Sequence, residues 1–430
     1  MHRNSFIAHG CWRRSACVAL AVALTTVAPN LLAQSPPAPD TPTLRQAFDA
    51  AWSRQPEALA LAARRDAVRA QQQSAQSWTP EPAALELSTR TDRPGRNLGT
   101  REYELGLAVP LWLPGERARS QALADAEGRA LESRATAVQL RVAASVRNAW
   151  WTWQRARAEA DTARGQLDKV RRIAADVGKR VRAGDLARAD QHQADGAVAA
   201  AEAAAAQTEA SVVAAQQQLR ALTAMPAPGA APGWNASDSE PEPVLVALAA
   251  ADTDLHGEVL ALKDRAAVAQ GVAALAAAQS RANPELTITT SRDRGAFGEP
   301  YQQTFTLGLR IPFGAGARHS ARTAAARAEV IEVQAQLALE RARLEGERES
   351  ARARTDAART QLAAADRRAQ LAHESRGFFD KSFRLGETDL PTRLRIEAEA
   401  VDAERQATRA RIELAEAVSA WRQALGLLPQ

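Results

Sequence analysis

The sequence predicts a mixed α/β membrane protein made of two copies of one structural unit. Residues 102–109 alternate apolar and polar side chains as a strand does, and an Ala-rich helical run begins shortly after them at Glu116. The same change of pattern recurs over residues 306–318, where Leu307 matches Leu105 at a distance of 307 − 105 = 202 residues. This recurrence indicates an internal two-fold sequence repeat rather than two unrelated domains.

The first 33 residues have the pattern of a secretory signal peptide. An apolar run over residues 16–27 follows a positively charged start, and Ala33 offers a small residue for cleavage. The positive charges are those of Arg3, Arg13 and Arg14. Because the run is too short and too close to the start to span a membrane, we expect the segment 1–33 to be removed.

Both cysteines of the chain, Cys11 and Cys17, lie within this signal. The mature protein is therefore expected to carry no disulfide, no thiolate metal site and no lipid on cysteine. Removal of the signal lowers the formal net charge from +5 to 5 − 3 = +2, because it takes away three arginines and no acidic residue. With no basic patch interleaved with aromatic residues, nucleic acid is not an expected partner.

The first structural repeat is expected over residues 43–225, after a Pro-rich tether at 34–42. Apolar residues at helical spacing predict that it opens with a helix over 44–78. Alternating residues on both sides of a polar turn then predict a β-hairpin over 83–109. A run without proline follows and predicts a long helical pair over 116–224.

The second structural repeat is expected over residues 244–428, after a Pro-rich linker at 226–243. It has the same order of elements, with a helix predicted over 244–281 and a β-hairpin over 285–311. Its long helical pair is predicted over 318–427. The chain therefore holds four predicted strands in two hairpins.

Aromatic residues stand at both ends of the predicted strands. The chain's only two tyrosines, Tyr103 and Tyr301, each begin a returning strand, and Trp78, Trp112 and Phe313 stand at the opposite ends. Such aromatic girdles mark the two membrane–water interfaces of outer-membrane barrels. The alternative interpretation is that these rings belong to the core of a small soluble sheet.

Each repeat continues into a long helical pair. The first long helix, 116–182, has 67 residues. At a rise of 1.5 Å per residue, such a helix measures about 100 Å. Gly184 and Gly386, again 202 residues apart, are expected to form the turns at the tips of the two pairs. Apolar residues recur every three or four positions along 167–181, which is typical of a coiled-coil seam and also fits a structural coiled-coil protein.

Four strands match the length that crosses an outer membrane but cannot close a barrel. Known outer-membrane barrels have eight strands or more, so the chain must share its barrel with other copies. Two copies would supply 2 × 4 = 8 strands and three copies 12. Because a barrel of more than eight strands leaves a lumen, the polar and small residues that alternate with the apolar ones fit a water-filled interior.

In its motifs and their order, the sequence resembles the TolC-type outer-membrane efflux channels over nearly the whole mature chain. Residues 43–57, which include Thr43-Leu44 and Pro56-Glu57, are similar to the opening motif of that family. The junctions between strand and helix, Val109-Pro110-Leu111 and Ile311-Pro312-Phe313, are similar as well. So are the helix-tip segments 182–184 and 383–387.

The resemblance implies a homotrimer with a twelve-stranded β-barrel in the outer membrane of a Gram-negative bacterium. A long α-helical barrel would continue it through the periplasm and meet a periplasmic adaptor (membrane fusion) protein and an inner-membrane efflux pump. The implied function is that of a passive exit duct in a tripartite efflux system, with no enzyme activity and no cofactor.

Within that family, residues 383–395 look most like the branch that serves cobalt–zinc–cadmium pumps, which implies heavy-metal cations as one cargo. The mature chain has four histidines and one methionine, spaced too far apart to form a metal site. They are His192, His256, His319, His373 and Met225. We expect no metal site in this chain, so any selection of a metal would happen elsewhere in the assembly.

The resemblance also points to a periplasmic gate with an acidic ring. Asp190, six residues beyond Gly184, falls on an acidic position of the family, but the matching residue beyond Gly386 is a threonine, with Arg393 and Arg395 near it. We expect Asp190 of one helix pair and these arginines of a neighbouring pair to hold the tip shut. The alternative is that the charges only solvate a helix end.

Two other classes of protein compete with this interpretation. A periplasmic adaptor also has a long helical hairpin, but it needs only one and adds Gly-rich β domains. A structural coiled-coil protein would not need four strands with aromatic ends. The sequence shows no nucleophile elbow, phosphate-binding glycine loop or metal cluster, so an enzyme is not expected.

Overall fold

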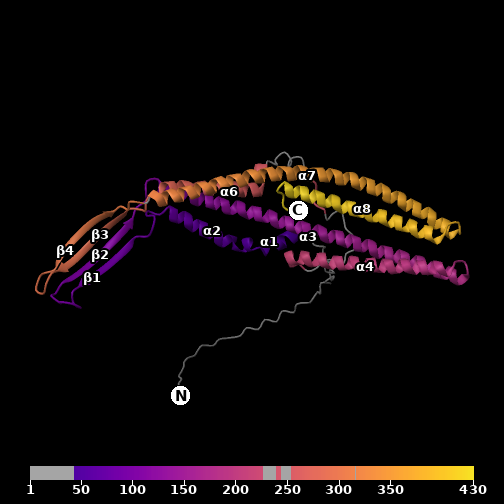
Figure 1. Ribbon diagram of the computed structural model, residues 1–430, viewed down its shortest axis with the longest axis horizontal. Coiled ribbons are helices and arrows are strands. Elements are labelled where there is room, and N and C mark those ends of the chain that lie inside the picture. The colour runs from indigo at the N-terminus through magenta and orange to yellow at the C-terminus, as the bar shows by residue number, and fades with distance from the viewer. Residues whose placement is uncertain (1–42, 226–238, 244–252, 315) are drawn as a thin grey trace, which may run out of the picture. The chain divides into compact units, whose positions relative to one another are not determined.

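The computed structural model describes residues 43–225, 239–243, 253–314 and 316–430. The predicted signal and tether, most of the predicted linker and the start of the second repeat lie outside these residues. The described elements follow the order shown in Figure 1. They are α1 (Leu44–Ser53), α2 (Pro56–Ala75), β1 (Ala84–Thr91), β2 (Arg101–Pro110), α3 (Glu116–Ala183), α4 (Arg188–Thr223), η2 (Thr253–Leu255), α6 (Gly257–Ala278), β3 (Glu285–Arg294), β4 (Gln302–Arg310), α7 (Gly316–Arg384) and α8 (Leu390–Ala424).

The prediction of a single helix over 44–78 is wrong, because the chain forms two helices there, α1 and α2. Thr43 caps α1 in a capping box, accepting a hydrogen bond from the backbone N–H of Gln46 at 3.2 Å. The break comes at Pro56, which has no N–H to donate to the preceding turn and holds Gln55 in an extended conformation. Pro56 instead becomes the first residue of α2, where its missing N–H costs nothing.

Two long helices run the length of the helical part, α3 with 68 residues and α7 with 69. Figure 1 shows α2, α1 and α4 following one another along α3, and α6 and α8 following one another along α7. The helices α3 and α6 also contact each other and so join the two repeats. No described helix is both long enough and apolar enough to cross a membrane.

Glycine ends the first long helix at its tip. Gly184 is the C-cap of α3 with a φ of 89°, a left-handed conformation that is strained for residues with a Cβ. The N–H of Asp185 then reaches back to the carbonyl of Arg180 at 2.9 Å. Gly386 has the same conformation after α7, with a φ of 80°. Both tip turns therefore form where the sequence placed them.

The four strands form one antiparallel sheet in the order β1-β2-β3-β4. The central pair, β2 and β3, comes from different repeats, and Leu107 pairs with Ile288 across it. At the junction with the helices, the N–H of Leu111 donates to the carbonyl of Pro284 at 2.7 Å. The strands thus hold the two repeats together at the end of the helices where α3 and α7 begin.

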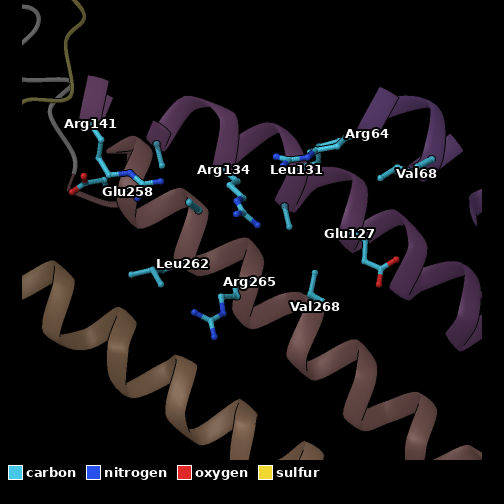
Figure 2. Close-up of a pocket in the computed structure, with 14 residues that line it drawn as sticks. Arg64, Val68, Glu127, Leu131, Arg134, Arg141, Glu258, Leu262, Arg265 and Val268 are labelled. Atoms are coloured by element: carbon cyan, nitrogen blue, oxygen red, sulfur yellow. The ribbon is translucent and has the colours of Figure 1, made fainter. Parts of the chain in front are cut away.

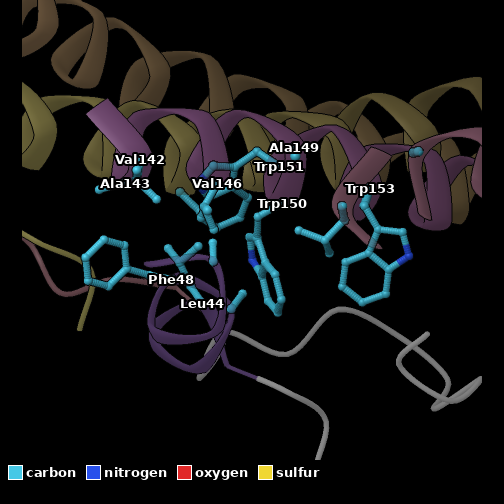
Figure 3. Packing of buried hydrophobic residues seen from close by; sticks show 14 of the residues in the cluster. Leu44, Phe48, Val142, Ala143, Val146, Ala149, Trp150, Trp151 and Trp153 are labelled. Atoms are coloured by element: carbon cyan, nitrogen blue, oxygen red, sulfur yellow. The ribbon is translucent and has the colours of Figure 1, made fainter. Parts of the chain in front are cut away.

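The main hydrophobic core lies where α1 packs on α3 and α4 (Figure 3). Its largest members are three tryptophans, Trp150, Trp151 and Trp153, each at most 3% exposed. Leu44 and Phe48 of α1 belong to the same cluster. The Ala-rich faces of the helices allow close approach elsewhere. Because this cluster buries more apolar side chains than the cluster near the helix tips, it is the larger hydrophobic contribution to the stability of the helical part.

The end of the predicted linker returns to the helices. Glu240 is buried between α3 and α8, where its carboxylate forms ion pairs with Arg147 at 2.7 Å and Arg422 at 3.2 Å. The hydroxyl of Ser419 also donates to it. The last residues of the predicted linker therefore belong to the packed helical part, because this buried carboxylate fixes residue 240 to both repeats.

Candidate functional site

One face of the sheet is apolar and exposed, and the strand register defines it. Leu85 pairs with Leu107, which pairs with Ile288, which in turn pairs with Leu307, so one apolar row crosses all four strands. In the single chain, 73% of the surface of Leu307 is exposed. This apolar face consists of Leu85, Leu87, Leu105, Leu107, Val109, Leu286, Ile288, Phe305, Leu307 and Leu309.

The opposite face is polar or small. One row across it joins Glu86, Gly106, Thr289 and Thr306. All acidic residues of the strands lie on this polar face, namely Glu86, Glu102, Glu104, Glu285 and Asp293, together with Arg90 and Arg310. One sheet therefore separates a hydrophobic surface from a charged and hydrated one.

The two outer strands leave backbone groups unpaired. In the described part of the chain, β1 pairs only with β2, and β4 pairs only with β3. An exposed edge of this kind is a template for pairing with another strand. Both edges of the sheet, β1 and β4, therefore have backbone groups free to pair with a further strand.

The predicted interface aromatics occupy the two ends of the sheet. Trp78 is 94% exposed and Phe313 83% exposed next to the helices, where the indole N–H of Trp112 donates to the carbonyl of Ser77 at 3.2 Å. At the loop end, the rings of Tyr103 and Tyr301 lie 6.4 Å apart between centroids. Their role at membrane interfaces stays a prediction.

At the other end of the helices, the two tips meet around one aromatic side chain. Phe383 of α7 is 2% exposed and packs against Ile173 and Val177 of α3. Guanidinium groups stack on its ring from two helices, with the Cζ of Arg180 at 4.9 Å and that of Arg393 at 4.5 Å from the centroid. This cluster joins the helical pairs of both repeats.

The three predicted gate residues have different surroundings within one chain. Arg393 has a side chain only 15% exposed and pairs with Asp380 at 2.9 Å and with Asp176 at 3.8 Å. Arg395 is 61% exposed and pairs with Glu399 along its own helix. The carboxylate of Asp190 accepts a hydrogen bond from the backbone N–H of Ala187 at 3.0 Å, at the start of α4.

The structure therefore does not bring Asp190 and the arginines into contact within a chain, and their pairing between chains stays a prediction. Sequence reasoning missed Phe383, Asp176 and Asp380 as members of the tip cluster. The apolar spacing near the end of α3 indicates an apolar surface close to the tip, but no sequence pattern identifies Phe383, Asp176 and Asp380 as the residues that meet there.

A groove of about 840 Å³ lies between α2, α3 and α6 (Figure 2). Its walls combine aliphatic side chains with four arginines, which are Arg64, Arg134, Arg141 and Arg265. Burial raises the pKa of Glu127 in this groove, and its Oε2 has no hydrogen-bond partner in the described structure. Burial also raises the pKa of Glu258, which pairs with Arg343 at 2.8 Å. Sequence reasoning did not single out this groove.

No group of three or more His, Cys, Asp or Glu side chains that could hold a metal ion occurs among the described residues. Of the histidines, His256 is buried, and its Nδ1 accepts a hydrogen bond from the N–H of Glu258 at 3.3 Å. Burial lowers the pKa of His256. This histidine thus caps the start of α6.

Known proteins share this architecture. The family model for "Outer membrane efflux protein" matches residues 47–225, which lie in the first repeat. None of the curated proteins matches the chain. The structure is similar to CusC, described in work on folding and transmembrane channel formation, with a TM-score of 0.73 at 15% identity over 90% of this chain and 92% of that one.

Two other solved channels give similar values. The outer membrane protein VceC from Vibrio cholerae has a TM-score of 0.70 at 16% identity, over 89% of this chain and 96% of that one. The open state of the MtrE outer membrane channel from Neisseria gonorrhoeae has a TM-score of 0.68 at 17% identity, over 90% and 89% of the two chains. The predicted fold is therefore confirmed, because the chain has the fold of these outer-membrane proteins over 89–90% of its length.

Proposed function

We propose that this chain is an outer-membrane efflux protein, the exit duct of a tripartite efflux system. The observation that carries the proposal is a four-stranded sheet with an exposed apolar face and two open edges, continued by helices of 68 and 69 residues. At 1.5 Å per residue, such helices extend about 100 Å, far beyond the thickness of a bilayer. Solved channels with the same fold support this function.

The protein acts as a homotrimer under this proposal. Lipid does not tolerate open sheet edges, so β1 of one copy must pair with β4 of the next until the ring closes. Three copies of a four-stranded sheet supply 3 × 4 = 12 strands. Such a barrel places the apolar face against lipid and the polar face around a lumen wide enough for water.

The helical part extends into the periplasm of a Gram-negative cell and contacts a periplasmic adaptor and an inner-membrane pump. Solutes pass through passively, so the chain needs neither a catalytic site nor a cofactor. The tip holds the gate, formed by Arg393 and Arg395 with Asp190 of a neighbouring helix pair. The adaptor opens it by binding the open form more tightly.

Heavy-metal cations are the cargo that we propose to test first. The resemblance of residues 383–395 to the cobalt–zinc–cadmium branch supports this choice. The charge of the polar face agrees with it, because this face carries five acidic residues and two arginines, a formal charge of 2 − 5 = −3 per chain. Three such faces around one lumen would favour cations over anions.

Purification from membranes followed by planar-bilayer recording tests the channel proposal. We expect the protein in the outer-membrane fraction, with a trimer mass in mild detergent and stepwise conductance in bilayers. A folded monomer in the soluble fraction would instead favour a periplasmic adaptor or a structural coiled-coil protein.

Deletion of the gene tests the cargo. We expect the deletion strain to become more sensitive to cobalt, zinc or cadmium salts and to recover when the gene is supplied again. Sensitivity to drugs alone, with unchanged metal tolerance, would refute the metal assignment and leave the channel proposal intact.

A further inference from the structure

The strand positions at the loop end of the apolar face carry arginines and no acidic residue. Beyond Leu105 and Phe305, toward the loops, the next row on the same face contains the pair Tyr103 and Arg292. The row after that contains the pair Arg101 and Arg294. Every acidic residue of the strands is on the polar face. The two faces therefore differ in the sign of their charge as well as in polarity.

Aromatic rings hold two of these arginines in place. The guanidinium Cζ atoms of Arg292 and Arg294 lie 5.0 Å and 5.1 Å from the centroid of the Tyr301 ring. Arg294 also lies 5.4 Å from the ring centroid of Phe297. Stacking restricts the motion of the side chains, and a planar guanidinium can still donate along its edges. The donors are thus partly ordered before any ligand arrives.

The nearby carboxylates are occupied elsewhere. Asp92 pairs with Arg101 at 3.1 Å and accepts a hydrogen bond from the N–H of Leu98. Glu299 accepts from the N–H of Gly295 at 3.1 Å and so closes its own loop. Within the described structure, no carboxylate lies within 4.0 Å of a guanidinium nitrogen of Arg292 or Arg294. Two positive charges therefore remain without an ionic partner.

We propose that Arg292 and Arg294, with Tyr301, bind the phosphorylated headgroup of a lipid. This inference rests on the proposed function, because it requires the apolar face to meet a membrane. Arginine pairs bind phosphate oxygens through directed, charge-assisted hydrogen bonds. The apolar rows begin one position farther along the same face, at Leu105 and Phe305, so acyl chains can lie on them while the phosphate contacts the arginines. A free phosphate ion would make no use of these rows.

Native mass spectrometry of the detergent-purified trimer tests this site, with bis-phosphorylated lipid A as the probe. We compare the parent with Arg292→Gln/Arg294→Gln and with a matched control, Arg90→Gln/Arg310→Gln, which removes the same charge from the polar face. The first variant should raise the Kd roughly tenfold, because each arginine contributes charge-assisted hydrogen bonds to phosphate. The control should stay within about twofold of the parent, because it touches no lipid contact.

Two further measurements use the parent protein alone and so do not depend on the folding of a variant. Dephosphorylated lipid A should bind roughly tenfold more weakly than the phosphorylated form. Inorganic phosphate at millimolar concentration should leave the bound lipid in place. Equal binding of the two lipids, loss of lipid to free phosphate, or equal losses in both double variants would each overturn the proposal. Failure to form a membrane trimer would refute the channel proposal instead.

Discussion

Arg393 lies over the ring of Phe383, with its guanidinium carbon 4.5 Å from the ring centroid. Arg393 belongs to α8 and Phe383 to the end of α7, and the same ring is buried against α3. One contact therefore links three long helices near the tip. Movement of the second helical pair away from the first has to expose this ring or carry α3 with it.

Under the proposed channel function, we expect Arg393→Ala to open the tip. The change removes the ion pair with Asp380 and the stacking on Phe383, together worth about 1–2 kcal/mol in a partly wet site. Mean single-channel conductance in planar bilayers should rise, and cells should take up more large antibiotic. Arg405→Ala is the matched control, because Arg405 lies on the same helix outside the proposed gate, has a side chain 60% exposed and pairs with Asp402 of its own helix.

The double variant Asp190→Ala/Arg395→Ala asks whether the gate also has contacts between chains. Among the described residues of their own chain, Asp190 contacts Ala187 and Arg395 pairs with Glu399, both within one helical turn. An increase in conductance would therefore report a lost contact with a neighbouring copy. Conductance equal to that of the parent would mean that these charges only solvate the helix ends and that the gate lies elsewhere.

Phe383→Ala should loosen the tip without unfolding the rest of the protein. Removal of a buried Phe side chain costs about 3–5 kcal/mol, and this cluster is separate from the core around Trp150. Hydrogen exchange of backbone amides should speed up near the ends of α3 and α7. Phe378→Ala, on the same helix but 68% exposed, should change little. Equal effects of the two variants would contradict the role of Phe383 in holding the two helical pairs together at the tip.

Alanine should have opposite effects at two glycines of the second repeat. Gly386 has a φ of 80°, so Gly386→Ala strains the tip turn by about 1 kcal/mol. Gly377 lies within α7 with open space around it, so Gly377→Ala should stabilise the helix by about 0.5–1 kcal/mol. Thermal unfolding followed by circular dichroism measures both changes. A shift of the same sign in both would contradict the assigned backbone conformations.

Glu240→Gln should destabilise the middle of the helical part. Arg147 and Arg422 are buried and would lose their shared counter-charge, which costs about 3–5 kcal/mol. Glu242→Gln removes a charge two residues away, where the pair with Arg359 is exposed, and should cost at most about 1 kcal/mol. Denaturant unfolding compares them. Similar midpoints for the two variants would show that the buried cluster contributes nothing specific.

Glu127→Gln should stabilise the protein at neutral pH and lose this advantage in acid. Burial raises the pKa of Glu127 above its ordinary value, so the charged carboxylate destabilises the folded state at pH 7. As the pH falls through the raised pKa, the folded protein takes up a proton and the cost disappears. The difference in Tm between variant and parent should therefore be positive at pH 7 and approach zero near the ordinary carboxyl pKa.

Glu132→Gln, on the same helix, is the control, and its effect on stability at pH 7 should have the opposite sign. Its hydrogen bond with Arg65 lowers the pKa of Glu132, so the parent gains stability from the charged form. That gain is present above the ordinary carboxyl pKa and is lost as the pH falls through the lowered one. The variant should be slightly less stable than the parent at pH 7. A higher Tm for Glu132→Gln at pH 7 would contradict this reasoning.

Features that depend on local sequence could be predicted, and those that depend on distant contacts could not. The strands and both tip turns follow from alternation and from Gly184 and Gly386, which act within a few residues. The break before Pro56 was equally local and could have been found. In contrast, Glu240 meets Arg147 across 93 residues, and Arg180 meets the carbonyl of Phe383 across 203 residues. No pattern within one segment indicates such partners.

The pairing of β2 with β3 sets how the complete channel would assemble. Each chain makes one joint between its own two hairpins, and this joint forms at any protein concentration because the chain connects them. The joint between β4 of one copy and β1 of the next has the same chemistry but requires copies to meet. In a closed ring, half of the joints between neighbouring hairpins would therefore form within chains. The other half, between β4 of one copy and β1 of the next, would depend on concentration. Dilution before membrane insertion should thus leave intact open sheets rather than separated hairpins.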